Sequence, residues 1–136
     1  MPDRGAPQPI AREQRLRRRS DLSALQARGS SITNSLLVLR MAANQLPFPR
    51  YAFAVSRRVS QKAVVRNRIR RRLRELVRHA PVRGGWDLLF IARQRAAAAG
   101  FGELSEAASG LLRRARLLAP EAPAPRNTVT PGQGQA

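Results

Sequence analysis

One short segment constrains the fold most, because it is both strongly cationic and regularly apolar. Residues 64–76 read VVRNRIRRRLREL, and six of these thirteen residues are arginine. A block of like charge usually repels itself and stays disordered. Apolar residues nevertheless recur here at the spacing of one helix face, namely Val65, Ile69, Leu73 and Leu76. The pattern predicts a helix from about residue 60 or 61 to residue 79, with its apolar side packed on a core.

On a helical wheel of roughly 100° per residue, this helix carries charge on every side except the apolar one. Val77 extends the apolar side. The side opposite to it, called here the outer stripe, consists of Asn67, Arg71, Arg74 and Arg78. The borders between the two sides are also cationic, with Arg66 and Arg70 along one border and Arg68 and Arg72 along the other.

The excess of positive charge predicts a polyanionic partner. Residues 57–78 contain ten basic residues and one acid, Glu75, and the whole chain has a formal net charge of +18. A merely solvated helix would mix signs in pairs four residues apart. Nucleic acid is favoured over a membrane surface, because the apolar face is needed for the core and carries no aromatic wedge. Asn67 could bind a phosphate, ribose or base edge, or be a neutral exposed substitution, and the wheel leaves both open.

The sequence predicts no catalytic residue and no metal site in the protein. Cysteine is absent, which excludes disulfides and thiol chemistry, and the eight acids are scattered rather than paired. The one histidine, His79, ends the basic helix, where it suits the helix dipole. No apolar run resembles a secretory signal or a membrane span, so we expect a cytoplasmic protein.

The chain is predicted to form one domain with two flexible ends. Residues 1–14 are expected to form a flexible arm and residues 119–136, rich in Pro and Gly, a disordered tail. Between them, residues 15–118 are predicted to fold as a small α+β sandwich, with helices packed on one sheet. The other elements expected in it are a helix at 20–29, strands at 35–41, 51–56 and 86–92, a loop at 44–50, and a helix from 102 or 103 to 118.

Four ordered motifs resemble one family. Residues 66–74 read RNRIRRRLR, which resembles the RNRxxRxxR motif of the bacterial ribonuclease P protein subunit. The flanking motifs are similar to those of the same family: LRRRSDL at 16–22, VSRR at 55–58 and WDLLFIAR at 86–93. The resemblance covers about residues 15–118. It implies an αβββαβα fold with a left-handed crossover through the arginine-rich helix.

The resemblance also implies a function. In this family the catalytic subunit is RNA, which uses Mg²⁺ to cleave the 5′ leader from precursor tRNA, and the protein binds no cofactor itself. The expected partners are therefore the catalytic RNA and precursor tRNA, with no membrane and no obligate protein partner. The resemblance makes Asn67 a predicted RNA contact, together with Arg57, Arg58, Lys62, Arg66, Arg68, Arg70, Arg71, Arg74 and Arg78.

A cleft between the first helix and the sheet holds the leader strand in this family, and in this chain it would be lined by Leu22, Leu25, Arg40 and Tyr51. Leu22, Leu25 and Arg40 align with family aromatics, which stack on unpaired bases, whereas leucine gives apolar contact only. Arg40 could instead stack or pair with a phosphate. The alternative to a ribonuclease P subunit is a structural ribosomal RNA-binding protein, which composition alone would fit equally well.

Overall fold

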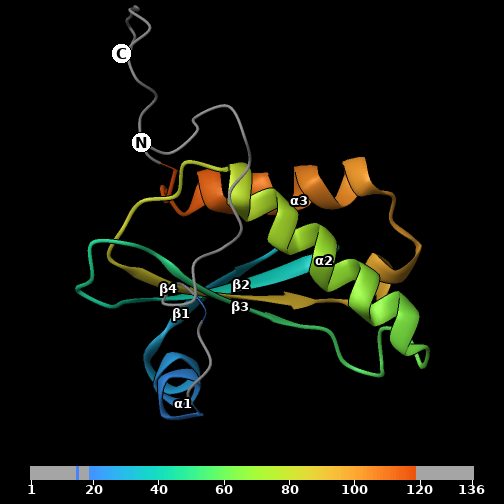
Figure 1. Ribbon diagram of the computed structural model, residues 1–136, viewed down its shortest axis with the longest axis horizontal. Coiled ribbons are helices and arrows are strands. Elements are labelled where there is room, and N and C mark those ends of the chain that lie inside the picture. The colour runs from blue at the N-terminus through green and yellow to red at the C-terminus, as the bar shows by residue number, and fades with distance from the viewer. Residues whose placement is uncertain (1–14, 16–18, 119–136) are drawn as a thin grey trace, which may run out of the picture.

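The computed structural model describes residue 15 and residues 19–118, so the predicted arm at 1–14 and tail at 119–136 lie outside the described residues. The order of elements matches the predicted αβββαβα fold, with one added 3-10 helix (Figure 1). The elements are α1 (Arg19–Arg28), β1 (Ser30–Thr33), β2 (Leu37–Ala43), β3 (Arg50–Ala54), α2 (Ala63–His79), β4 (Trp86–Ala92), η2 (Gln94–Ala98) and α3 (Phe101–Arg114).

The four strands form one mixed sheet in the order β1-β2-β4-β3. Antiparallel pairing joins β1 to β2 and β2 to β4, whereas β3 and β4 are parallel. A parallel pair needs a crossover connection rather than a hairpin. Here the crossover is α2, so the arginine-rich helix is built into the link between two paired strands. The left-handedness that the resemblance implies for this crossover stays a prediction.

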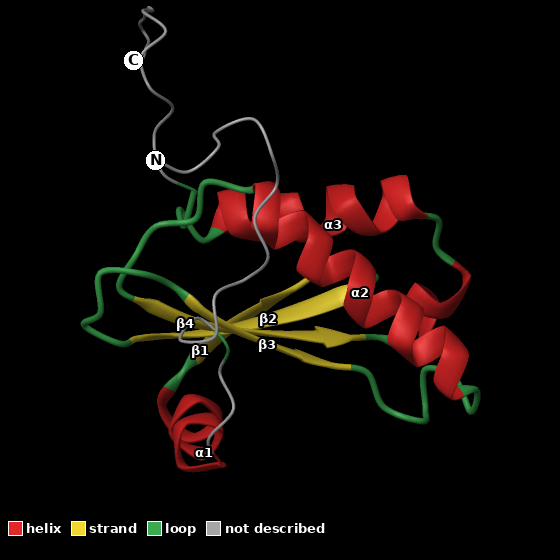
Figure 2. Ribbon diagram, in the orientation of Figure 1, coloured by secondary structure: helices red, strands yellow, loops and turns green. Residues whose placement is uncertain are grey.

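Helices cover the two faces of the sheet unequally. The helices α2 and α3 lie on one face, and α1 lies on the other (Figure 2). Along β4, Leu88 and Phe90 belong to the cluster under α2 and α3, whereas Leu89 and Ile91 belong to the cluster under α1. The alternation follows from the two-residue repeat of a strand. Because β4 is flanked on both sides and covered on both faces, it is almost entirely apolar.

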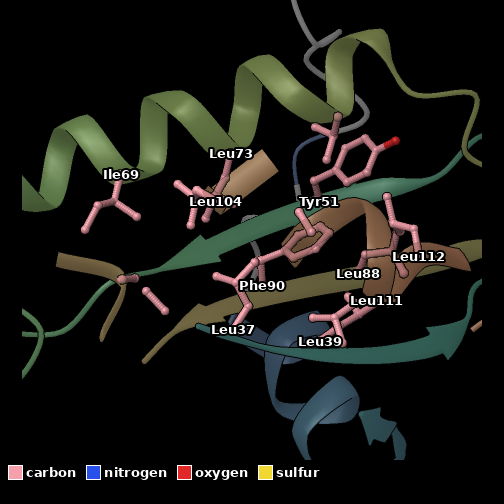
Figure 3. Packing of buried hydrophobic residues seen from close by; sticks show 14 of the residues in the cluster. Leu37, Leu39, Tyr51, Ile69, Leu73, Leu88, Phe90, Leu104, Leu111 and Leu112 are labelled. Carbon is pink, nitrogen blue, oxygen red and sulfur yellow. The ribbon is translucent and has the colours of Figure 1, made fainter. Parts of the chain in front are cut away.

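The main core confirms the predicted orientation of the basic helix. Ile69 and Leu73 of α2 face the sheet (Figure 3), and with Val77 they are at most 3% exposed. Val65 and Leu76 are half-buried and pack against the same cluster. Each fully buried aliphatic side chain contributes roughly 1.5–3 kcal/mol. This apolar side therefore offsets the self-repulsion of the charged sides. The other large buried side chains of the cluster include Leu37, Leu39, Tyr51, Phe90, Leu104, Leu111 and Leu112.

Three predicted ends of helices and strands were wrong, because local turns, which periodicity cannot detect, determine where these elements begin or end. The strand expected at 35–41 begins at Leu37, because Asn34 Oδ1 accepts hydrogen bonds from the backbone N–H of residues 36 and 37. The basic helix begins at Ala63, since Ser60 Oγ accepts from the Lys62 N–H and closes a turn. Arg116 has φ 60, which breaks the final helix after Arg114.

The sequence also left two elements unpredicted. No strand was placed at residues 30–33 from the sequence pattern, yet β1 (Ser30–Thr33) pairs with β2 over four residues. Its one apolar residue, Ile32, packs on the main core, while its neighbours are exposed at the edge of the sheet. The helix η2 follows β4 and buries Ala96. No described helix is long and apolar enough to cross a membrane.

Candidate nucleic-acid interface

The outer stripe of α2 lies on the solvent side of the helix. Asn67, Arg71 and Arg74 are exposed. Arg78 is less free, because it is half-buried and forms an ion pair with Glu75 three residues earlier. Glu75 also contacts His79 Nε2 at 3.0 Å, and the hydrogen bonds from His79 and Arg78 lower the pKa of its carboxyl. The only acid of this helix is thus ionised, and it partly neutralises Arg78 of the outer stripe.

Asn67 is held in a defined orientation. Arg70 Nη1 donates a hydrogen bond to Asn67 Oδ1 at 2.6 Å. With its oxygen engaged, the amide presents its N–H groups as donors, which suit a phosphate oxygen or a ribose hydroxyl. Two interpretations of Asn67 were open on the wheel, and its contact with RNA stays a prediction.

Aromatic rings hold two of the arginines at the flanks of α2. The guanidinium of Arg74 lies 5.6 Å from the ring centroid of Phe53 on β3, and that of Arg72 lies 5.9 Å from the ring of Phe101 on α3. Such cation–π contacts limit the motion of long side chains. The guanidinium of Arg74 therefore lies toward β3, at the edge of the sheet. A helical wheel could not show this orientation, because it includes no neighbouring strand or helix.

Two further predicted RNA contacts, Arg66 and Arg68, are half-buried, and one of them has a role in the protein itself. Arg66 Nη1 donates to the carbonyls of Ser60 and Gln61, at 2.9 and 3.0 Å, and so closes the loop that enters α2. Arg68 is half-buried, and its Nε has no hydrogen-bond partner among the described residues. Their roles in RNA binding stay predictions, but Arg66 already has a structural use.

The loop between β3 and α2 adds cations at the start of the helix. Arg57, Arg58 and Lys62 are all exposed, while Val55 and Val59 anchor the loop in the core. The first turn of α2 contains no acid, and Lys62 at its N-cap makes no capping hydrogen bond through its side chain. The positive end of the helix dipole therefore adds to the three side-chain charges. The arrangement favours binding of anionic groups.

The predicted leader cleft is only partly assembled by the structure. Leu25 is 1% exposed and packs with Leu89 on the α1 face of the sheet, and the half-buried Leu22 joins them. Beside them, α1 and the sheet enclose a hollow of about 470 Å³, whose lining includes Asp21, Leu25, Arg28, Arg50 and Trp86.

Tyr51 does not belong to this group, and its inclusion was wrong. Its ring is 5% exposed, lies under α2 on the opposite face of the sheet and stacks on Phe53 (Figure 3). Burial raises the pKa of its phenol, which therefore stays protonated. The alternation of β3 places Arg50 and Ala52 on the α1 face and Tyr51 and Phe53 on the other.

Arg40 lies on the α1 face but is already engaged. Its Nη2 donates to the carbonyl oxygens of Gln26, Gly29 and Leu25, at 2.6, 3.0 and 3.3 Å. These carbonyls belong to the C-terminal end of α1, which carries negative dipole charge. In this conformation the guanidinium therefore binds the helix end rather than facing a phosphate. No local sequence signal reveals such a contact.

Sequence analysis missed a second polar cluster at the other end of α1. Arg50 donates to both carboxylate oxygens of Asp87 at 2.8 Å and to Asp21 Oδ2 at 3.3 Å. Asn44 Nδ2 also donates to Asp87 at 2.8 Å, and the bidentate Asp87 contact raises the pKa of Arg50. The signal available was Asp87 itself, the one charged residue in the apolar strand WDLLFIA. A buried carboxylate needs a partner.

The described acids do not form a metal site. No group of three or more His, Cys, Asp or Glu side chains lies together within the part of the chain that the structure describes. Asp21 and Asp87 share Arg50, Glu75 is paired with Arg78, and Glu103 Oε1 accepts from the N–H of Gly100. Each of these carboxylates has a structural partner.

Comparison with known proteins identifies the family. The model of the family described as ribonuclease P matches residues 10–116. The ribonuclease P protein component of Dehalococcoides mccartyi is 38% identical over 104 residues, which cover 76% of this chain and 86% of that relative. That of Symbiobacterium thermophilum is 41% identical over 107 residues, covering 76% and 92%.

Solved structures agree with the sequence relatives. The RNase P protein of Staphylococcus aureus has a TM-score of 0.71 at 25% identity and covers 78% of this chain and 98% of its own. The protein from Thermotoga maritima has a TM-score of 0.68 at 28% identity, with coverage of 74% and 96%. A structural ribosomal protein is accordingly not favoured. The chain belongs to the ribonuclease P protein family, the accessory subunits of an RNA-based endoribonuclease that processes tRNA.

Proposed function

We propose that the chain binds the catalytic RNA of ribonuclease P through the outer stripe of α2 and the β3–α2 loop. One observation carries the proposal: α2 buries Ile69, Leu73 and Val77 in the core while presenting Asn67, Arg71 and other polar groups to solvent. Each phosphate that these cations neutralise releases counterions. The residues proposed to bind are Arg57, Arg58, Lys62, Arg66, Asn67, Arg68, Arg70, Arg71, Arg74 and Arg78.

We also propose that the α1 face of the sheet receives the 5′ leader of precursor tRNA. On this face Leu22, Val38 and Ile91 are half-buried and so remain partly accessible, and α1 is the one described helix that covers it. Apolar side chains can contact unpaired bases, although without the stacking that aromatic rings provide. Leu25 supports the floor of this site from the interior. Tyr51 contributes to the core only.

The protein supplies positioning and charge rather than chemistry. The acids Asp21, Glu75 and Asp87 form ion pairs with Arg50 or Arg78, and we assign the Mg²⁺ of the reaction to the RNA subunit. Holding the substrate and screening phosphate repulsion lower the cost of bringing two polyanions together. We place the protein in the cytoplasm, with the catalytic RNA and precursor tRNA as its partners and with no membrane or obligate protein partner.

Reconstitution tests this function. The protein is mixed with a bacterial ribonuclease P RNA and a precursor tRNA, and cleavage is followed while Mg²⁺ is varied. The protein is expected to lower the Mg²⁺ concentration at half-maximal cleavage, because its cations replace part of the screening by Mg²⁺. If the protein binds the RNA but leaves this Mg²⁺ concentration unchanged, the proposed role in catalysis is refuted.

A further inference from the structure

The helix α1 has little apolar contact to hold it in place. Only Leu25 of its ten residues is buried, and it packs on Leu89 of β4. An isolated helix of ten residues is marginal in water, so tertiary contacts must stabilise and orient it. Besides Leu25, only the half-buried Leu22 of α1 joins this cluster, so apolar contact fixes the direction of the helix across the sheet only weakly. The remaining constraints have to come from polar side chains.

Arg40 on β2 holds the C-terminal end of α1. Its Nη2 reaches three backbone carbonyls of the segment from Leu25 to Gly29, and its Nε is buried without a partner in the described part of the chain. Moving α1 away would leave these carbonyls and the half-buried Arg40 without their hydrogen bonds, which is costly. Gly29 lets the end of α1 approach β2 closely. A Cβ at this position would lie 2.4 Å from the Leu25 carbonyl oxygen and 2.9 Å from that of Met41.

Arg50 on β3 holds the N-terminal end of α1. It bridges Asp21, in the first turn of the helix, to Asp87 of β4. Asp87 is 7% exposed and receives a further hydrogen bond from Asn44, so this end of the bridge is fixed in the sheet. Asp21 also lies favourably at the positive end of the helix dipole.

The sheet register places the two arginines on opposite sides of the central strand. Arg40 of β2 is opposite Leu89, and Arg50 of β3 is opposite Asp87. Leu25 packs on Leu89 close to the Arg40 contacts, because Arg40 also binds the Leu25 carbonyl, whereas Arg50 binds Asp21 near the other end of α1. Contacts near the two ends therefore set both the position and the direction of the helix.

We propose that Arg40 and Arg50 are positioning residues that hold α1 at the angle and distance that the leader site requires, without touching the leader. The proposal rests on the proposed binding of the leader at the α1 face. It gives Arg40 a role that differs from the stacking or phosphate pairing expected from sequence. Loss of either arginine should therefore impair discrimination between leader-bearing and mature tRNA, and leave binding of the catalytic RNA by α2 intact.

The test compares Arg40→Met, which keeps the apolar stem, with Arg40→Lys, which keeps a charged donor. Affinities of the assembled holoenzyme are measured for precursor tRNA and for mature tRNA. Arg40→Met is expected to lower the preference for precursor by about three- to tenfold, because hydrogen bonds to charged groups are lost. Arg40→Lys should restore most of the preference. Arg114→Met is the matched control, since Arg114 also donates to a backbone carbonyl, that of Thr33, and does not contact α1.

A distance measurement separates positioning from direct contact. The chain has no native cysteine, so nitroxide labels can be attached at Ala27→Cys on α1 and Ala98→Cys on η2, both exposed positions. The distance distribution between the labels is expected to broaden in Arg40→Met and to narrow again in Arg40→Lys. Lost precursor preference with an unchanged distribution would overturn the proposal, because Arg40 would then contact the leader itself.

A second variant covers the case in which Arg40→Met does not fold. Arg50→Lys can still pair with the buried Asp87, but a lysine cannot bridge both carboxylates. It should broaden the same label distances and lower the precursor preference. Wild-type preference in a folded Arg50→Lys or Arg40→Met protein overturns the inference. If the wild-type holoenzyme itself shows no precursor preference, the proposed leader site fails instead.

Discussion

The double substitution Arg71→Ala with Arg74→Ala tests the outer stripe quantitatively. Both side chains are exposed on α2, and we expect each to neutralise one phosphate of the catalytic RNA. Each lost contact then reduces the slope of log K against log[salt] by about 0.7–0.9. The variant is therefore expected to lower the slope by about 1.4–1.8, while the fold is retained because neither side chain is in the core.

The same relation gives the loss of affinity at each salt concentration. We take about 1 M monovalent salt as the concentration at which these contacts contribute nothing. With a slope of about 0.8 per contact, two contacts are then worth about 20-fold in Kd at 0.15 M, about 100-fold at 0.05 M and about threefold at 0.5 M. The loss is thus expected to shrink as salt rises. The assay is a titration of ribonuclease P RNA with protein at several KCl concentrations and constant Mg²⁺.

The matched control removes the same charge from the opposite side of the sheet. Arg19 and Arg28 are exposed residues of α1, and changing both to alanine should leave the slope near that of wild type. If the slope falls equally in both variants, the RNA responds to total charge and not to the stripe. An unchanged slope in Arg71→Ala with Arg74→Ala would refute the assignment of these two side chains.

Three further variants probe the acid of α2, the core and the corrected tyrosine. Glu75→Gln frees Arg78 and should tighten RNA binding about fivefold at 0.15 M salt, and a titration showing weaker binding would contradict this. Contacts with His79 and Arg78 lower the pKa of Glu75, so they stabilise the fold above pH 4.5, the usual pKa of the group, and this stabilisation is lost as pH falls through the lowered pKa. The free energy of unfolding of Glu75→Gln should therefore change less with pH in that acid range than that of wild type. Leu73→Ala should cost about 2–5 kcal/mol of unfolding free energy by denaturant titration, because Leu73 is fully buried. Tyr51→Phe should leave precursor preference unchanged in the holoenzyme assay, since its ring lies on the α2 face.

The basic helix could be predicted because its information is local. The spacing of Val65, Ile69, Leu73 and Leu76 identifies one face, and everything else on the helix follows from geometry. The structure confirms the buried side of α2. Its start was misplaced by two or three residues, since Ser60 closes a turn that periodicity cannot detect.

The α1 face could not be predicted, because its information lies in the pairing of distant strands. Arg40 and its carbonyl partner on Gln26 are fourteen residues apart, and the contact exists only once β2 is registered against β4. Tyr51 was assigned to the wrong face of the sheet for the same reason. Alternation along β3 places Tyr51 and Ala52 on opposite faces, but it does not say which helix covers which face. The strand β1 was missed because a short edge strand with one apolar residue has almost no periodic signal.

The parallel crossover has a consequence for how the protein acquires stability. Because α2 joins β3 to β4, most of the proposed RNA-binding surface lies within the connection that completes the sheet. An RNA bound there as proposed would be a ligand of the native chain alone. A free RNA concentration of 100 times Kd would stabilise the fold by about 2.7 kcal/mol. The subunit should accordingly melt at a higher temperature inside its ribonucleoprotein than alone, and protein released from the RNA should be the form most open to proteolysis.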